Sequence, residues 1–182
     1  RLAGDFLKAA NWCYERRSDM RFIVPLANDA CRAAFAEVQA GVNRQLPVTL
    51  LSGQGLEAMA AANAVMLASG TATLECMLIK RPMVMAYRLA PLTYQLARLL
   101  VSTPYYSLPN LLADQPLVKE FIQNDISTQA LGEEILRLVE NPENTRELTE
   151  VFTEIHDELR QDASRIAADT IMEMTGRSVT HG

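Results

Sequence analysis

Four short runs of apolar residues, each followed by a helical pattern, constrain the fold of this chain most strongly. The runs are RFIVPL at 21–26, VTLL at 48–51, AVMLA at 64–68 and PMVMAY at 82–87. They do not alternate apolar with polar residues, and continuous apolar strands are typical of parallel sheets that are buried on both faces. Because strands and helices alternate through short connections, the sequence predicts an α/β fold with a doubly wound parallel sheet.

The first helix is expected over most of residues 1–17. Its apolar residues fall on one helical face, namely Leu2, Phe6, Ala9, Ala10 and Cys13. No capping residue precedes Arg1, and the chain does not begin with methionine. We therefore expect the chain to be the C-terminal part of a longer protein. The next helix, after the strand at 21–26, is expected to be capped by Asn28 or Asp29.

The pattern becomes mainly helical after residue 88. We expect a helix over PLTYQLARLLVS at 91–102, a short strand or extended loop within YYSLPNLLAD at 105–114, and helix from PLVKEFIQ at 116–123 onward. In the helix at 91–102, Leu96, Arg98, Leu99 and Leu100 can either contact acyl chains or a membrane surface, or form an ordinary amphipathic core helix.

The C-terminal residues form the helical tail of the predicted fold. Ser127 is expected to begin a helix, Asn141–Pro142 to end it, and a long helix to follow from about 143 to 175. We divide the chain into a sheet domain at 1–126 and C-terminal helices at 127–182, which pack on that domain or on a partner.

Composition excludes several function classes. The net charge of −5, with no basic run interleaved with aromatic residues, argues against nucleic acid as a partner. The longest apolar run, at 58–70, is broken by Asn63 and Ser69 and is shorter than the roughly 20 residues that a membrane span needs. We therefore expect a protein that is not integral to a membrane.

The cysteines and histidines do not form a metal-binding pattern. Cys13, Cys31 and Cys76 are far apart in the sequence, and His156 and His181 lie far from all three. We expect no metal site, and three buried free thiols in a reducing cytosol.

The polar turn after the strand at 64–68 is the candidate binding site. Parallel α/β sheets bind ligands outside the carboxyl ends of their strands, where Ser69, Gly70 and Thr71 stand. Gly70 lets a ligand approach the backbone closely, and Ser69 or Thr71 can cap the following helix. Backbone N–H groups at a helix N-terminus bind phosphate. The Glu75 carboxylate, one helical turn further on, can accept hydrogen bonds from the two hydroxyl groups of a ribose.

The turn thus predicts a nucleoside diphosphate, with phosphates on the turn and sugar on Glu75. The alternative is a plain capped connection followed by a solvated glutamate. The chain contains neither the glycine-rich dinucleotide fingerprint nor the phosphate-binding loop of ATPases. A dinucleotide enzyme and an ATPase of that class are therefore not expected.

A longer pattern in the sequence adds a family resemblance. LASGTATLECMLIKRPMVMAYRLAPLTYQLARLLV at 67–101, followed by YYSLPNLLADQPLVKEFIQ at 105–123, closely resembles the C-terminal half of the lipid-A-disaccharide synthases. DFLKAA near the start, IVPLAN and LLSGQGLEAMAAANAVMLASGTA extend the likeness over nearly all of the chain. The combination of S-G-T-A-T-L-E, Y-R-x-x-P-L-T and S-L-P-N-L-L makes it specific.

The resemblance implies a glycosyltransferase of the GT-B class, in which two Rossmann-like domains face each other across a cleft. It implies transfer of 2,3-diacylglucosamine from UDP to 2,3-diacylglucosamine 1-phosphate, which forms the β-1,6-linked disaccharide of lipid A. The donor linkage is α and the product linkage β, so the reaction inverts, and neither a metal nor another cofactor is expected. The implied location is the cytoplasm of a Gram-negative bacterium, with a homodimer and a peripheral contact with the inner membrane left open.

The resemblance also assigns positions within this chain. They are Ser69, Gly70, Thr71 and Ala72 for the diphosphate, Glu75 for the ribose, Gly53 and Gln54 near the uracil, and Asn110 lining the cleft. Arg88 after the fourth strand can pair with a phosphate there or be a solvated loop arginine. The catalytic residues are unknown, and the family pattern implies that they lie in an N-terminal domain outside this chain.

In the family pattern the first strand of this domain and its phosphate-binding loop lie upstream of Arg1. With the usual strand order 3-2-1-4-5-6, the strands at 21–26 and 64–68 would each pair with that first strand and not with each other. This chain alone is then expected to be inactive.

Two other classes stay as alternatives. UDP-sugar 2-epimerases share the two-domain architecture and a similar serine-glycine turn with a nearby glutamate. They usually carry paired acidic residues after the turn, whereas Glu75 is followed by Cys76. The third class is a non-catalytic nucleotide-binding module.

Overall fold

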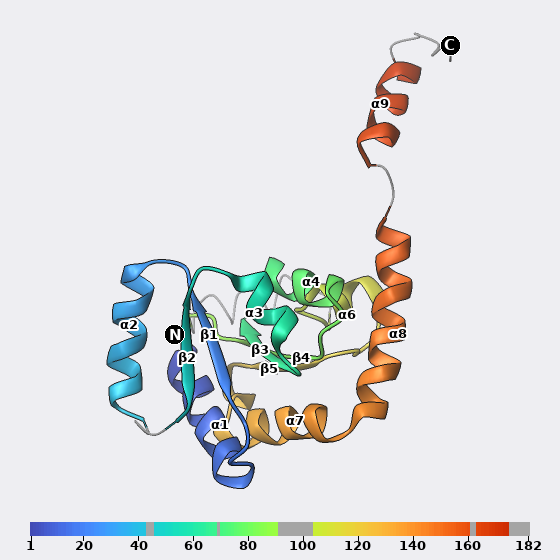
Figure 1. The fold of residues 1–182 in the computed structure, drawn as a ribbon. Helices are drawn as coiled ribbons and strands as arrows, with labels where there is room; N and C mark the ends of the chain where they lie inside the picture. The colour runs from blue at the N-terminus through green and yellow to red at the C-terminus, as the bar shows by residue number, and fades with distance from the viewer. Residues whose placement is uncertain (43–45, 69, 91–103, 161–162, 175–182) are drawn as a thin grey trace.

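The strands in the described part of the chain form two parallel sheets. The computed structural model describes residues 1–42, 46–68, 70–90, 104–160 and 163–174. In one sheet β1 (Phe22–Leu26) pairs with β2 (Val48–Ser52). In the other, β4 (Met83–Tyr87) lies between β3 (Val65–Ala68) and β5 (Lys119–Ile122) (Figure 1). All pairs are parallel, which confirms the predicted α/β class.

Helices separate these strands along the chain. They are α1 (Ala3–Arg16), α2 (Asp29–Ala40), α3 (Gly55–Ala61), α4 (Thr71–Leu78), α6 (Leu108–Ala113), α7 (Thr128–Glu140), α8 (Pro142–Leu159) and α9 (Ala163–Met174), with a short 3-10 turn, η1 (Gln123–Asp125), after β5. The predicted caps of two helices are confirmed. The Asn28 side chain accepts a hydrogen bond from the Cys31 N–H at 2.9 Å, and the Ser127 hydroxyl accepts one from the Ala130 N–H at 3.1 Å.

Strand β4 shows why its sequence is a continuous apolar run. Val84 and Ala86 pack with buried residues of α1 and α7, whereas Met83 and Met85 pack with buried residues of α4 and α8. Successive side chains of a strand point to opposite faces, so both faces of β4 are covered by helices and both must be apolar. The predicted doubly wound arrangement follows from this burial. Helices α7 and α8 share these two cores, and the domain division at 126/127 stays a prediction.

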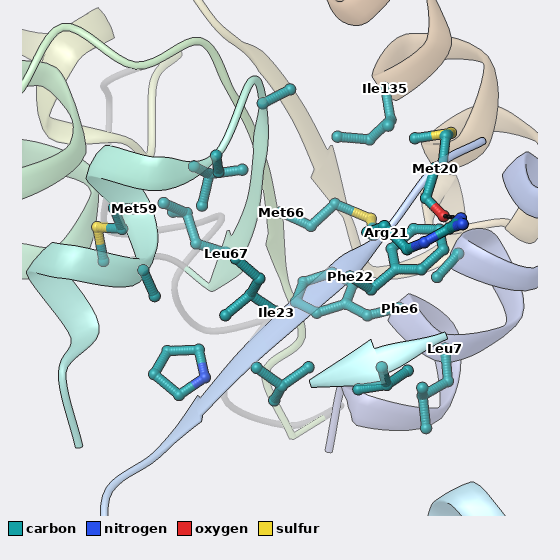
Figure 2. A pocket seen from close by; sticks show the side chains of 18 of the residues that line it. Phe6, Leu7, Met20, Arg21, Phe22, Ile23, Met59, Met66, Leu67 and Ile135 are labelled. Carbon is teal, nitrogen blue, oxygen red and sulfur yellow. Dashed lines mark hydrogen bonds between the residues drawn. The ribbon is translucent and has the colours of Figure 1, made fainter. Parts of the chain in front are cut away.

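A gap separates the two sheets. The edges of β1 and β3 do not pair with each other, as the strand order implied by the family resemblance predicts. Between them lies an apolar groove of about 740 Å³. Figure 2 shows the side chains of Phe6, Phe22 and Met66 gathered in it, with Leu67 and Ile135 also lining the groove.

Three predicted elements in the C-terminal half differ from the structure. Residues 108–113 form α6 instead of a strand or loop, because Pro109 at the start of a helix costs no hydrogen bond. Residues 119–122 form β5 instead of a helix, because they pair with β4 and bury Phe121 against it. The long helix at 143–175 is two helices, α8 and α9. The predicted helix at 91–102 lies outside the described residues.

The C-terminal helix α9 extends beyond the end of α8, away from the sheets (Figure 1). It exposes Ile166, Ile171 and Met174. Over the part of the chain that the structure describes, every helix is too short or too polar to cross a lipid bilayer.

Candidate nucleotide-binding site

The turn between β3 and α4 has a backbone that only glycine adopts readily. Gly70 has φ 141° and ψ −164°, a region that is essentially restricted to glycine and costly for residues with a Cβ atom. A Cβ atom built on Gly70 would meet no other atom within 4 Å, so crowding is not the reason for the glycine. The turn therefore combines a constrained backbone with open space beside it, which is what close approach of a ligand requires.

The cap of α4 differs from the prediction. Gly70 itself occupies the N-cap position, and no side chain caps the helix there, so the expectation that Thr71 acts as the cap is wrong. Ser69 lies outside the described residues. A glycine has no side chain that could compete for the first N–H groups of α4. These groups and the helix dipole face the carboxyl edge of the sheet, as a phosphate site needs.

Thr71 and Glu75 lie on the same exposed face of α4. Both side chains are solvent-exposed, and residues four apart on a helix are neighbours. Ala72, the fourth position assigned to the diphosphate, is half-buried in the same first turn. Thr71 of the predicted phosphate turn and the predicted ribose carboxylate of Glu75 are thus exposed neighbours on one helix, and Glu75 forms no salt bridge with another described residue.

The second predicted turn stands at the carboxyl end of β2. Gly53 and Gln54 both have positive φ, at 68° and 58°. The Gly53 N–H donates to the Leu26 carbonyl at 2.8 Å, which ties the carboxyl ends of β2 and β1 together. Gln54 then begins α3, which packs against α4. The two turns therefore lie on adjoining helices at one edge of the fold.

Two arginines at the carboxyl edge have partners within the chain. Arg88 follows β4 and forms a salt bridge with Asp5 of α1, at 3.0 Å between Nη1 and Oδ2. The sequence did not indicate this contact, and pairing of Arg88 with a phosphate stays a prediction. Arg32 of α2, which sequence reasoning missed, donates to the Ser52 hydroxyl at 2.9 Å.

Asn110 has a buried side chain that is engaged at both ends. Its amide nitrogen donates to the Val118 carbonyl at 2.9 Å and to a Glu120 carboxylate oxygen at 2.8 Å. Its amide oxygen accepts from the Val118 N–H at 2.8 Å. Asn110 is only 1% exposed, so it braces α6 against the start of β5. A direct contact with a ligand stays a prediction.

Glu120 is the centre of this polar network and was not found by sequence reasoning. Its carboxylate accepts hydrogen bonds from the Tyr106 N–H at 3.0 Å, from the Ser107 N–H at 2.8 Å and from the Ser107 hydroxyl at 2.6 Å. The one signal in the sequence was its place inside the short apolar run VKEFI at 118–122. A carboxylate in a half-buried strand is unfavourable unless hydrogen-bond donors surround it.

The cysteines are not a functional cluster. Burial raises the pKa of the Cys13 thiol to about 11 and that of the Cys76 thiol to about 12, so both are protonated at neutral pH. Cys31 is exposed, which corrects the expectation of three buried thiols. It stands in the first turn of α2, a helix that buries mainly Phe35. No group of three metal-ligating side chains occurs among the described residues.

Comparison with known proteins identifies the family of this chain. The family model described as lipid-A-disaccharide synthetase matches residues 1–172. The chain belongs to this family. Its curated relatives include a lipid-A-disaccharide synthase of Hahella chejuensis, 46% identical over 183 residues, which span 100% of this chain and 46% of that protein. Another, of Azotobacter vinelandii, is 51% identical over 159 residues, which span 87% of this chain and 41% of that protein. The chain spans less than half the length of these relatives.

A solved structure shares the fold. The UDP-GlcNAc 2-epimerase of Neisseria meningitidis, bound to UDP-GlcNAc, matches with a TM-score of 0.55 over 94% of this chain and 41% of that one. The two sequences are 17% identical, so the likeness supports the Rossmann-like fold and says nothing of the reaction.

Proposed function

We propose that this chain is the UDP-binding part of a lipid-A-disaccharide synthase. The full-length enzyme would transfer 2,3-diacylglucosamine from UDP to 2,3-diacylglucosamine 1-phosphate, with inversion at the anomeric carbon. The observation that carries the proposal is the uncapped Gly70 turn at the carboxyl end of β3, followed on the same exposed helical face by Glu75. Membership of the lipid-A-disaccharide synthetase family supplies the substrate class.

The proposed pose follows from the charges that this face offers. The diphosphate lies against Gly70, Thr71 and Ala72, where N–H groups at the start of α4 donate to its oxygens. The ribose lies one turn further along α4, where the Glu75 carboxylate accepts hydrogen bonds from its two hydroxyl groups. A carboxylate one turn from the phosphates avoids direct repulsion and still reaches the sugar. Ser69, which is outside the described residues, keeps its assignment to the diphosphate from the family resemblance.

Residues from the other elements complete the proposed site. Gly53 and Gln54 border the uracil from the start of α3, which packs on α4. Arg88 and Asn110 stay assigned to the cleft. Within the chain, Arg88 also pairs with Asp5, and Asn110 also donates to the Val118 carbonyl. The N–H groups supply the charge stabilisation, so the proposal requires no metal and no cofactor besides the donor itself. The catalytic base is assigned to no residue of this chain.

The proposed location follows from the substrates. Both carry acyl chains, so the enzyme would work in the cytoplasm at the inner face of the inner membrane through a peripheral contact. The predicted homodimer is tested by the mass of the full-length protein in solution.

The test supplies the full-length enzyme with both lipid substrates and measures UDP release together with the disaccharide. We expect both products in equal amounts only when donor and acceptor are present. The variant Glu75→Ala should lose most of this activity at low donor concentration. Glu147→Ala, which removes an exposed carboxylate on α8, is the matched control and should retain it.

Two outcomes would overturn the proposal in different ways. Conversion of the donor in the absence of the acceptor would identify an isomerase of the UDP-sugar 2-epimerase type. UDP binding without any turnover of the two lipid substrates by the full-length protein would identify a non-catalytic nucleotide-binding module.

A further inference from the structure

We propose that Thr73 is a positioning residue that sets the orientation of the phosphate-binding turn and couples it to the segment 106–110. The inference rests on the proposed function, because it assumes that the Gly70 turn binds the diphosphate. Thr73, Leu108 and Glu120, which carry the coupling, were assigned to the site neither by the sequence pattern nor by the family resemblance. The coupling runs from Gly70 through Thr73 and Leu108 to Glu120.

The first step is the double hydrogen bond on the Gly70 carbonyl. The Thr73 hydroxyl donates to this oxygen at 2.8 Å, and the Thr73 N–H donates to it at 3.1 Å. A trans peptide is planar, so the N–H of Thr71 points opposite to the Gly70 carbonyl. Holding that carbonyl toward Thr73 therefore aims the Thr71 N–H out of the helix, toward the open side of the turn. The two bonds fix the donor that a phosphate would use.

The second step is the bond on the other side of the same hydroxyl group. The Thr73 oxygen accepts from the Leu108 N–H at 3.3 Å, at the first residue of α6. Thr73 is completely buried, so water cannot replace either partner. A hydroxyl group has one proton to donate and lone pairs to accept, so a single side chain serves the turn and α6 at once.

The third step is the anchoring of α6. The Glu120 carboxylate accepts bonds from the Tyr106 N–H, the Ser107 N–H, the Ser107 hydroxyl and the Asn110 amide, between 2.6 and 3.0 Å. Ser107 and Asn110 are almost completely buried. Bonds to a charged acceptor are stronger than neutral ones, so the start of α6 is held rigidly to β5. Leu108 can therefore present its N–H to Thr73 from a fixed position.

The consequence is a turn that is ordered before its ligand arrives. Glycine is the residue type with the greatest backbone freedom, so without the Thr73 hydrogen bonds the peptide plane between Gly70 and Thr71 could rotate. A binding group that is already oriented loses less entropy when the ligand binds. The hydrogen bond between Leu108 and Thr73, which are 35 positions apart, thus couples the motif S-L-P-N to the motif S-G-T-A-T-L-E.

The test compares three variants of the full-length enzyme by calorimetric titration with UDP and by steady-state kinetics. Thr73→Val keeps the shape of the side chain and removes the hydroxyl, and it should raise the Kd for UDP about tenfold. Thr73→Ser keeps the hydroxyl and should bind UDP within about twofold of the wild type. Phe152→Leu, which alters the core that Cys76 and Met77 of α4 share, should lower the thermal stability and leave the Kd unchanged.

The kinetic readout separates positioning from a purely structural role. In Thr73→Val the KM for the donor should rise about tenfold while the KM for the acceptor stays the same. Glu120→Gln tests the far end of the network without changing the turn, and it should raise the Kd for UDP in the same direction.

Unchanged UDP affinity in Thr73→Val and Glu120→Gln would overturn the coupling, and equal losses in Thr73→Ser and Thr73→Val would overturn the role of the hydroxyl. Failure of the wild-type enzyme to bind UDP would instead overturn the proposed function.

Discussion

The substitution Gly70→Ala separates the conformational role of the turn from its role in binding. At φ 141° and ψ −164° the backbone lies in a region that is essentially restricted to glycine, and holding another residue there costs of order 1–3 kcal/mol. The added methyl group would meet no protein atom within 4 Å, so no steric clash adds to this cost. The whole penalty is smaller than the roughly 5–15 kcal/mol stability of a typical domain. We therefore expect a folded variant.

The effect on binding should be larger than the effect on folding. The open space beside Gly70 is where the diphosphate is proposed to lie, and a methyl group there would keep the phosphates from the backbone. We expect the free energy of unfolding of the full-length enzyme to fall by about 1–3 kcal/mol, and UDP affinity to fall by more than about a hundredfold, beyond what the strain alone explains.

The assay pairs urea denaturation with calorimetric titration of UDP, and Gly55→Ala is the matched control. Gly55 also has open space around it but begins α3 without a positive φ, so an alanine there should be neutral or stabilise by up to about 1 kcal/mol. A Gly70→Ala enzyme that binds UDP like the wild type would show that the turn is only a connection between β3 and α4.

Three further predictions follow from packing, exposure and the gap between the sheets. Gly132→Ala should destabilise the full-length enzyme by about 1–3 kcal/mol in thermal or chemical unfolding, because the new methyl carbon would lie 2.4 Å from the ring of Trp12. Among the three cysteines of this chain, Cys31 should be the one that reacts rapidly with a thiol reagent at pH 8 in the native full-length protein. The other two cysteines are buried with raised pKa values, and they should react only after denaturation. The 182-residue chain alone should show no cooperative thermal transition and should aggregate through the edges of β1 and β3. Joining it to the segment that precedes the matched region in a full-length relative should restore the transition, and a sharp transition of the isolated chain would contradict this reasoning.

The first half of the fold could be predicted from the sequence because its signals are local. The apolar runs predicted as strands at 21–26, 48–51, 64–68 and 82–87 correspond to β1, β2, β3 and β4 to within one residue at each end. The Asn28 and Ser127 caps are read directly from one residue and its neighbours. The separation of β1 from β3 was also predicted, but only by combining the strand order of doubly wound sheets with the additional strand that the family resemblance implies.

The errors lie where long-range contacts decide the structure. Residues 119–122 contain Lys119 and Glu120 and look helical, but pairing with β4 makes them a strand and the amides of residues 106–110 satisfy the carboxylate. Within the site, the sequence suggested Gly70 and Glu75 through the strand-turn-helix pattern. It gave no sign of the Arg88 salt bridge, which joins residues 83 positions apart, or of the link from Thr73 to Leu108.

The central claim is that Glu75 binds the ribose of UDP, and the most direct test is calorimetric titration of the full-length enzyme with UDP and with 2′-deoxy-UDP. The charge-assisted hydrogen bonds from the two ribose hydroxyl groups to Glu75 contribute roughly 1.5–3 kcal/mol. The wild type should therefore bind UDP about tenfold more tightly than 2′-deoxy-UDP, and Glu75→Ala should weaken UDP binding by about ten- to a hundredfold. In Glu75→Ala the two nucleotides should bind equally, whereas Glu147→Ala should keep the wild-type preference. A preference for UDP that persists undiminished in Glu75→Ala would contradict the account.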